Sequence, residues 1–233
     1  MKILGIIPAR GGSKGVPGKN IKLLGELPLL AYTAKSALAS KQLSKVILST
    51  DSPSIAAVAQ HYGIEIPFLR PETLATDTAS SIAVVQHAVS YLENQGEFFD
   101  AVCLLQPTSP FRPKGFIDLA IQKFIHDDVD ALVSVLPVPH EFNPHWVFEP
   151  NEKGLLQIAT GEQEIIKRRQ DLPPAYFRDG ALYITKTSVI KEGSFYGAKL
   201  SYIENNPAFY VNIDTEADWE KATAQLPLVK SQL

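Results

Sequence analysis

The chain lacks features on which several classes of protein depend. It has one cysteine, Cys103, which excludes an intramolecular disulfide and any metal cluster built from cysteines. Cys103 lies in an apolar run at residues 101–105, where a buried thiol is expected rather than a nucleophile. The first apolar run is interrupted at Arg10, so it is too short for a signal peptide or a membrane span. We therefore expect a cytoplasmic protein without a membrane partner.

An excess of positive charge is also lacking. The chain has 22 Lys and Arg residues against 25 Asp and Glu residues, a net charge of −3, so nothing favours a nucleic-acid partner. Its 233 residues are 45% hydrophobic, which suffices for one sizeable core. We expect a single domain over residues 1–233, with residues 137–178 as an arm.

Positive charge is instead concentrated in one loop. A buried strand predicted at residues 3–7 leads into residues 8–20, which hold four glycines and the three cations Arg10, Lys14 and Lys19, without a carboxylate. Glycines let backbone N–H groups approach a ligand closely, and the cations supply positive charge. The pattern predicts a loop that holds a polyphosphate. The alternative interpretation is a solvated basic turn.

This loop departs from the two common phosphate-binding motifs. A P-loop needs glycine where Ser13 stands and a hydroxyl where Asn20 stands. The glycine spacing does not fit the Gly-x-Gly-x-x-Gly fingerprint of dinucleotide-binding folds, and Pro17 would interrupt a helix that began inside the loop. A triphosphate is therefore expected to lie against an extended loop rather than on a helix N-terminus.

Apolar, strand-like segments alternate with helical patterns over the first 135 residues. Strands are predicted at residues 3–7, 46–50, 101–105 and 131–136, and helices at 29–39, 53–62, 80–92 and 115–126. This alternation is typical of a parallel sheet covered by helices on both faces. Ligands of such sheets bind beyond the carboxyl ends of the strands, so the first loop, Asp51 and Gln106 are expected to share one cleft.

Further elements are predicted outside this alternation. They are a short extended segment at 65–69, strands at 181–185 and 210–213, and a closing helix at 215–224 with Thr215 as N-cap. Residues 137–177 show no convincing helix and contain six prolines, and a hairpin is predicted from 146–149 and 154–159.

Five aromatic residues in this irregular segment need an explanation. They are Phe142, Trp146, Phe148, Tyr176 and Phe177. A solvated excursion would not need them, because exposed apolar patches generally mark interaction sites. The segment is either a meander folded on its own domain or an arm that packs on a second subunit, and we favour the arm.

The first loop resembles the nucleotide-binding signature of the acylneuraminate cytidylyltransferases, which make CMP-activated sialic acids and their bacterial nonulosonate relatives. The likeness is carried by residues 6–20 and continues, in the family's order, through residues 69–71, 77–81, 105–110, 169–173 and 213–215. The resemblance implies a three-layer α/β/α fold with a mostly parallel sheet, of the nucleotide-diphospho-sugar transferase kind, and a protruding dimerisation arm. It further implies a homodimer with shared active sites.

The implied reaction couples CTP to a nonulosonic acid, with Mg²⁺ as cofactor. The anomeric hydroxyl of the sugar attacks the α-phosphate, giving a CMP-sugar and pyrophosphate. Such a reaction needs the triphosphate fixed in line with the hydroxyl and the charge of the leaving group neutralised. By resemblance, the catalytic residues are Arg10, Lys19 and Asp214, the two cations contacting the phosphates.

The resemblance also assigns binding residues. The expected nucleotide-binding residues are Ala9, Arg10, Gly11, Gly12, Ser13, Lys19, Asn20, Arg70, Ser80 and Ser81, and the expected sugar-binding residues are Gln106, Arg169 and Asp179. Asn20 is expected to touch the nucleotide or to anchor the loop. Two structural alternatives remain open, a surface ion pair for Arg70 and helix capping for Ser80.

The expected metal site departs from the family pattern. The usual Asp-x-Asp pair is here Asn212-Ile213-Asp214. Residues two apart at a strand end point to the same side, so Asn212 and Asp214 can share one cation. Magnesium takes one or two carboxylates together with phosphate oxygens and water, so the pair stays workable with one negative charge fewer. Glu216 and Asp218 are expected on the exposed face of the last helix.

The identity of the sugar is left open by two further departures. Residues 139–146 lack the lysine that some sialic-acid-activating relatives carry, although Lys167 or Arg168 can substitute, and the family asparagine before Gly-Ala is here Asp179. N-acetylneuraminate, legionaminate, pseudaminate and Kdn fit equally well. A metal site at His140 and His145 is a weaker alternative, because no third ligand is near.

Two other functions compete with this interpretation. One is a related sugar nucleotidyltransferase of the Kdo or hexose-phosphate type, against which residues 169–173 argue. The other is a catalytically silent nucleotide-sugar-binding protein, for which Asn212 is the best support.

Overall fold

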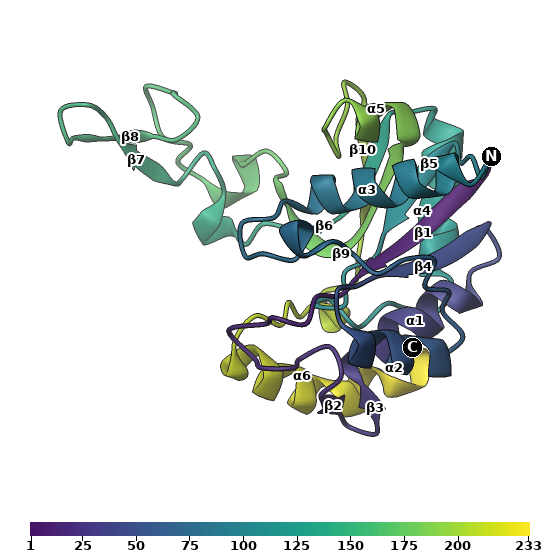
Figure 1. Ribbon diagram of the computed structural model, residues 1–233. Helices are drawn as coiled ribbons and strands as arrows, with labels where there is room; N and C mark the ends of the chain where they lie inside the picture. Colours follow the sequence, from purple (N-terminus) through teal and green to yellow (C-terminus); the bar gives the residue numbers. More distant parts are fainter. The chain divides into compact units, whose positions relative to one another are not determined.

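The run Ile-Leu-Gly-Ile-Ile-Pro forms strand β1 (Ile3–Pro8) inside a six-stranded sheet, in a computed structural model that describes residues 1–233 (Figure 1). The strand order is β10-β6-β9-β5-β1-β4. The other strands are β4 (Lys45–Ser49), β5 (Ala101–Leu104), β6 (Ala131–Pro137), β9 (Tyr176–Lys186) and β10 (Leu200–Glu204). Strand β1 pairs in parallel with β4 and β5, whereas β9 is antiparallel to β5, so the sheet is mixed and mostly parallel.

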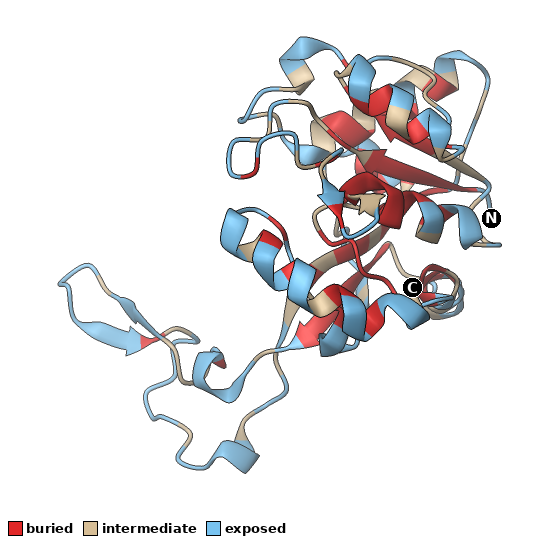
Figure 2. Ribbon diagram, turned by 90° about the horizontal axis from the view of Figure 1, so that it is seen from below, coloured by how far each residue is buried: buried red, intermediate tan, exposed pale blue.

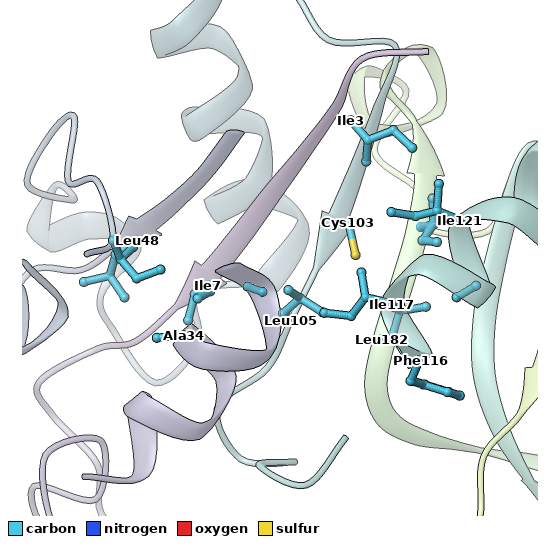
Figure 3. Close-up of a cluster of buried hydrophobic side chains, with 14 of the residues drawn as sticks. Ile3, Ile7, Ala34, Leu48, Cys103, Leu105, Phe116, Ile117, Ile121 and Leu182 are labelled. Atoms are coloured by element: carbon cyan, nitrogen blue, oxygen red, sulfur yellow. The ribbon is translucent and has the colours of Figure 1, made fainter. Parts of the chain in front are cut away.

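Alternate side chains of β1 face two different helical layers. Ile3 and Ile7 join a buried cluster with residues of α1 (Leu29–Ala39), α2 (Pro53–His61) and α4 (Phe116–Asp127), part of which Figure 3 shows. Leu4 and Ile6 point the other way, into a cluster with residues of α3 (Ser81–Asn94) and α5 (Thr187–Lys191). The expected three-layer α/β/α arrangement is confirmed.

Cys103 lies in the first of these clusters. Its side chain is fully buried, and burial raises the pKa of the thiol to about 12. A thiol with such a pKa stays protonated at neutral pH and is a poor nucleophile. The expectation of a buried, unreactive cysteine is confirmed.

A third cluster joins the first loop to the last helix. Trp219, Ala222 and Leu226 of α6 (Glu216–Val229) pack in a cluster that also contains the buried Val16 of the loop. A small hairpin of β2 (Leu23–Leu24) and β3 (Leu27–Pro28) follows the loop, and Leu24 belongs to the same cluster. The loop between β1 and α1 is thus held by the last helix.

Most expected elements occur within a residue or two of their expected ends. The helix over 29–39 matches α1, and the extended segment at 65–69 makes isolated bridges to β4 and Thr50. Thr215 caps α6 as expected, although the helix continues beyond 224 to Val229.

The strand expected at 210–213 is wrong. Residues after the 3₁₀ turn Pro207–Phe209 are extended but belong to no sheet, and the edge position is taken by β10. Val211 and Ile213 are buried against α6, which produces the alternation that a strand would show.

Residues 135–178 form a compact unit of their own, separate from the unit of residues 1–134 and 179–233. It contains no α-helix, as expected, and its hairpin consists of β7 (Phe148–Pro150) and β8 (Leu156–Ile158) in antiparallel pairing. Trp146 Nε1 donates to the carbonyl of Ile166 at 2.7 Å, and His145 pairs with Glu162 at 2.8 Å.

Burial differs between the two units. Figure 2 shows buried residues gathered in the sheet and on the inward faces of its helices, whereas the hairpin unit is mainly exposed. The large apolar side chains that this unit exposes are Phe142, Phe148, Leu155, Leu156, Ile165 and Tyr176. None of the helices in either unit is both long and apolar enough to cross a membrane.

Candidate active site

A cleft of about 360 Å³ brings together most of the predicted site residues of the first unit. It is lined by Pro8, Arg10, Ser13, Lys14, Gly15, Lys19, Asn20, Arg70, Leu74, Thr76, Asp77, Ala79, Ser81, Val84, Gln106, Pro107, Thr108 and Asp214. Pro8 ends β1, and Gln106 follows β5 closely, so the cleft lies at the carboxyl ends of parallel strands, where ligands of α/β sheets bind.

A larger cavity of about 750 Å³ lies elsewhere in the first unit. Residues of α1, α4, α6 and the turn between β2 and β3 line it, and none of the predicted site residues is among them. One of its lysines, Lys230, is paired with Glu26 at 2.8 Å. The residues of the glycine loop line the smaller cleft and not the larger cavity.

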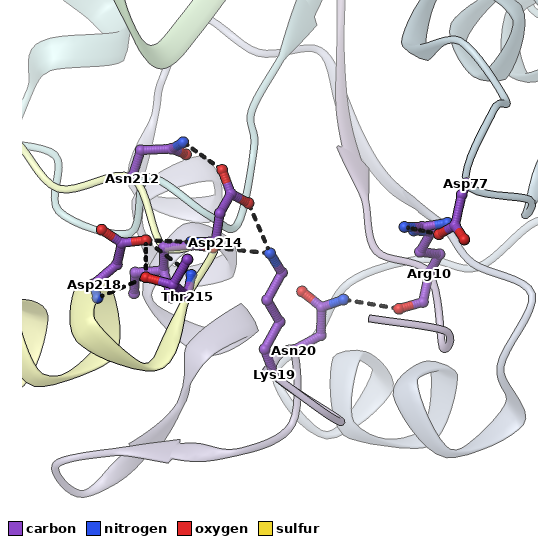
Figure 4. Close-up of polar contacts among 9 residues, drawn as sticks. Arg10, Lys19, Asn20, Asp77, Asn212, Asp214, Thr215 and Asp218 are labelled. Atoms are coloured by element: carbon purple, nitrogen blue, oxygen red, sulfur yellow. Dashed lines mark hydrogen bonds and ion pairs between the residues drawn. The ribbon is translucent and has the colours of Figure 1, made fainter. Parts of the chain in front are cut away.

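The glycine loop is held in place by backbone and side-chain hydrogen bonds. The Gly11 N–H donates to Asp51 Oδ1 at 2.9 Å, and the Ala9 N–H donates to the carbonyl of Ser49 at 3.0 Å. Asn20 is buried, and its Nδ2 donates to the carbonyl of Arg10 at 3.0 Å (Figure 4). Of the two roles expected for Asn20, anchoring the loop is the one that the structure contains.

Gly15 occupies a position of the loop where only glycine fits. A Cβ added at Gly15 would lie 1.9 Å from the carbonyl oxygen of Asp214, a distance that no side chain can occupy. The loop backbone therefore lies directly against the backbone of Asp214. The glycine loop and the expected metal site are therefore packed against each other.

Two cations of the loop share one carboxylate. Arg10 NH2 lies 2.7 Å from Asp77 Oδ1, and Lys14 pairs with the other oxygen of Asp77. Hydrogen bonds from Lys14 and Arg10 hold the pKa of Asp77 below its usual value, so the carboxylate is charged at neutral pH. Asp77 lies in the motif at residues 77–81, but its role was not predictable from the sequence, because the ion pairs span more than 60 positions of the chain.

Lys19 and the expected metal pair form a second polar group. Lys19 Nζ donates to the carbonyl of Ile213 at 2.8 Å and lies 3.1 Å from Asp214 Oδ1. Asn212 Nδ2 donates to Asp214 Oδ2 at 2.7 Å, so the side chains two apart do point to the same side (Figure 4). The Asp214 side chain is 61% exposed and open to a ligand.

Asp214 and Asn212 can supply only part of the coordination shell of a magnesium ion. No group of three or more His, Cys, Asp or Glu side chains is placed to hold a metal in the structure. Asp214 and the amide oxygen of Asn212 offer two oxygen ligands, and the remaining ligands must come from phosphate and water. Asp218 is used elsewhere, because it forms a capping box with Thr215, and Glu216 pairs with Lys22. Their expected place on α6 is confirmed.

Arg70 also lines the cleft. It is buried, its Nε donates to Ser49 Oγ at 3.0 Å, and its NH2 donates to the carbonyl of Ser49. Burial lowers the pKa of Arg70 to about 10, so it stays charged at neutral pH. The alternative of a surface ion pair is therefore wrong.

The two serines that begin α3 have different surroundings. Ser80 is the N-cap of α3, and its hydroxyl accepts from the Ala83 N–H at 3.3 Å, as the capping alternative predicted. Ser81 lines the cleft, whereas Ser80 does not.

Asp179 has a different place from the one expected. It is buried, Oδ1 accepts from Ser134 Oγ and from the Ala181 N–H, and Oδ2 accepts from Asn205 Nδ2 at 2.6 Å. It does not line the cleft, and both of its oxygens are occupied. The structure gives Asp179 a structural role in place of the expected sugar contact.

Arg169 belongs to the unit of residues 135–178, in the 3₁₀ turn Arg169–Asp171. Its contact with a sugar stays a prediction. Arg112, which is 1% exposed, was not predicted from the sequence. The only signal for it was a charged residue directly after Phe111, close to an apolar strand.

The sheet, the glycine loop and the cation-lined cleft define an α/β protein built to bind a phosphorylated ligand. Residues 4–225 match the family model described as Cytidylyltransferase, and the chain belongs to this family. The fold resembles that of CMP:2-keto-3-deoxy-manno-octonic acid synthetase complexed with CTP, with a TM-score of 0.72, 18% identity and full coverage of both chains.

Two bacterial relatives are similar along nearly their whole length. The CMP-N,N'-diacetyllegionaminic acid synthase of Legionella pneumophila is 39% identical over 223 residues, which cover 94% of each chain. The pseudaminic acid cytidylyltransferase of Campylobacter jejuni is 38% identical over 224 residues, which cover 95% of each chain. The resemblance inferred from the motifs is confirmed.

Proposed function

We propose that the protein couples CTP to a nonulosonic acid, giving a CMP-sugar and pyrophosphate. The observation that carries this proposal is the single cleft in which Arg10, Lys19, Arg70 and Gln106 meet the glycine loop. The names of the two bacterial relatives, a legionaminic acid synthase and a pseudaminic acid cytidylyltransferase, support the same substrate class.

The residues of the cleft suit a phosphoryl transfer. The anomeric hydroxyl forms a bond to the α-phosphorus and loses its proton, while the bond to the bridging oxygen breaks and pyrophosphate leaves. Arg10 and Lys19 supply charge to the triphosphate, and the loop backbone orients it. In the structure Asp77 pairs with Arg10 and so competes with the triphosphate for this cation.

Magnesium fits this scheme as an expected cofactor. When bound, it would neutralise charge on the phosphates, and Asp214 with the amide oxygen of Asn212 would hold it. Lys19 lies 3.1 Å from Asp214 and would stand beside the same phosphates.

The proposed function is tested by pyrophosphate release. CTP is incubated with N-acetylneuraminate, legionaminate, pseudaminate, Kdn and Kdo in turn, and a hexose 1-phosphate serves as the competing substrate class. We expect release with CTP and at least one nonulosonic acid, and far less with UTP, ATP or GTP. Comparable turnover with a purine triphosphate, or CTP binding without release for any sugar, would contradict the proposal.

The proposal includes a homodimer. The unit of residues 135–178 exposes Phe142 by 68% and Leu156 by 70%, which is costly in water and supports packing against a second copy. Sedimentation equilibrium should give twice the mass of one chain, and a monomer at micromolar concentration would contradict it. A cytoplasmic location stays a prediction.

A further inference from the structure

Arg112 is a buried charge in the first unit. Its side chain is 1% exposed, and its three hydrogen bonds go to neutral oxygens rather than to a carboxylate. Burying a guanidinium without a paired carboxylate is unfavourable, so its acceptors matter. Burial lowers the pKa of Arg112 to about 10, which leaves it charged at neutral pH.

The three acceptors come from three separate segments. Nε donates to the carbonyl of Ala181 in β9 at 2.8 Å, and NH2 donates to the carbonyl of Gln106 after β5 at 2.9 Å. NH1 donates to Thr33 Oγ1 in α1 at 3.0 Å. Because the guanidinium is rigid and planar, these bonds fix the spacing between the Gln106 backbone and β9.

The same spacing determines where the Gln106 side chain lies. A Cβ added at Gly180, the residue before Ala181, would lie 3.3 Å from Gln106 Oε1 and 2.9 Å from Ser109 Oγ. The Gln106 amide therefore rests against the backbone of β9. Its position depends on the two segments that Arg112 joins.

We propose that Arg112 is a positioning residue that holds the Gln106 amide in place for the sugar. The proposal rests on the proposed function, in which Gln106 contacts the sugar. Arg112 does not line the cleft and lies instead at the wall of the larger cavity. Its effect is therefore expected on sugar use and not on CTP binding.

The main test is Arg112→Lys, which keeps the charge but cannot make three in-plane bonds. We expect the KM for the sugar to rise at least about tenfold, while the Kd for CTP by calorimetry changes less than about twofold. The matched control is Arg70→Lys, another buried arginine, which lines the cleft at the side assigned to the nucleotide. It should raise the Kd for CTP and leave the KM for the sugar near the wild-type value.

A double-mutant cycle separates positioning from a general loss of structure. In the Gln106→Ala background, Arg112→Lys should no longer change the KM for the sugar, because the amide that it positions is absent. If the effect persists in full, Arg112 acts by another route and the proposal is wrong.

Two measurements keep the test decisive. If Arg112→Lys does not fold, Thr33→Val removes one acceptor of the guanidinium with little change in shape, and should raise the KM for the sugar about two- to threefold.

The Gln106 side-chain amide signals in an NMR spectrum, assigned by their loss in Gln106→Ala, should shift or broaden in Thr33→Val and Arg112→Lys but not in Arg70→Lys. This readout needs no turnover, so it distinguishes failure of the positioning role from failure of the proposed function. Unchanged amide signals in both variants would overturn the proposal.

Discussion

At the scale of single residues, the cleft contains a carboxylate where a phosphate is expected. Asp77 pairs with both Arg10 and Lys14 in the structure, which offsets the repulsion between these two cations. A triphosphate that uses these cations competes with Asp77 for them. The strength of this internal competition can be measured directly.

Asp77→Asn is predicted to lower the KM for CTP about two- to fivefold, since the carboxylate no longer competes for Arg10 and Lys14 and exposed ion pairs are weak. The pKa of Asp77 is held below its usual value, so the effect should not change between pH 6 and pH 8. Initial rates over a range of CTP concentrations give the KM. Asp77→Glu keeps the charge and is the control. A higher KM in Asp77→Asn would mean that Asp77 helps the nucleotide to bind.

Asn212 leads to a second prediction at this scale. With one carboxylate in the pair, the enzyme should need more magnesium for half-maximal rate than Asn212→Asp does. Asp214→Asn removes the remaining carboxylate and should lower the rate by about 10². A magnesium titration of the initial rate compares the three proteins. Near-normal activity of Asp214→Asn would place the metal elsewhere.

At the scale of elements, the glycine loop and α6 depend on each other. Val16 is buried in the cluster around Trp219 and Leu226, and Gly15 lies against the backbone of Asp214. A glycine is needed at position 15 because two backbone segments approach each other closely there. An unusual dihedral angle is not the reason, since the φ of Gly15 is not positive.

Gly15→Ala is predicted to displace the loop from Asp214 and to lower kcat/KM for CTP by about 10², the effect of a misplacement near 1 Å. It should also lower Tm, measured by differential scanning calorimetry. Gly12→Ala is the control for stability, because its added Cβ meets no protein atom within 4 Å. An unchanged Tm and rate for Gly15→Ala would show that the loop does not depend on this contact.

Elements with local signals were predictable from the sequence. The helix α1 begins after Pro28 and has the bounds expected from its apolar pattern, and the glycine loop follows β1 as expected. The strand at 210–213 failed because burial against a helix gives the same alternation as pairing in a sheet. The strand β10 was missed because its residues are exposed or half-buried. Propensity and pattern do not reveal which neighbour a segment will have.

The same distinction holds for the site. Arg10, Lys19 and Asn20 were predictable because glycines and cations gather in one short segment. Arg112 was not, because its acceptors Thr33 and Ala181 lie 79 and 69 positions away in the chain. The burial of Asp179 was hidden for the same reason, since Ser134 and Asn205 come from distant segments.

At the scale of the whole molecule, the unit of residues 135–178 carries Arg169 and the exposed apolar side chains. If a second copy covers this unit, Arg169 can serve the site of that copy. This assignment is open to a test that needs no structure of a complex.

Chains with Arg10→Ala and chains with Arg169→Ala are each predicted to be inactive alone. Co-expressed, they should recover about one quarter of wild-type activity, because half of the dimers would be mixed and each mixed dimer has one intact site of two. Tagging the two chains differently allows the mixed dimers to be purified and assayed. Mixed dimers without activity would mean that each site is built from one chain.

The contact between the glycine loop and the segment around Asp214 also bears on how the protein is made. Lys19 and Asp214 are 195 positions apart, so the loop reaches its final place only after α6 has been synthesised and has packed on Val16. A chain emerging from the ribosome can pair β1 with β4 and β5 long before that point. The glycine loop is therefore complete only after α6 has packed on it, and bound CTP would join the two ends of the fold and stabilise it against unfolding.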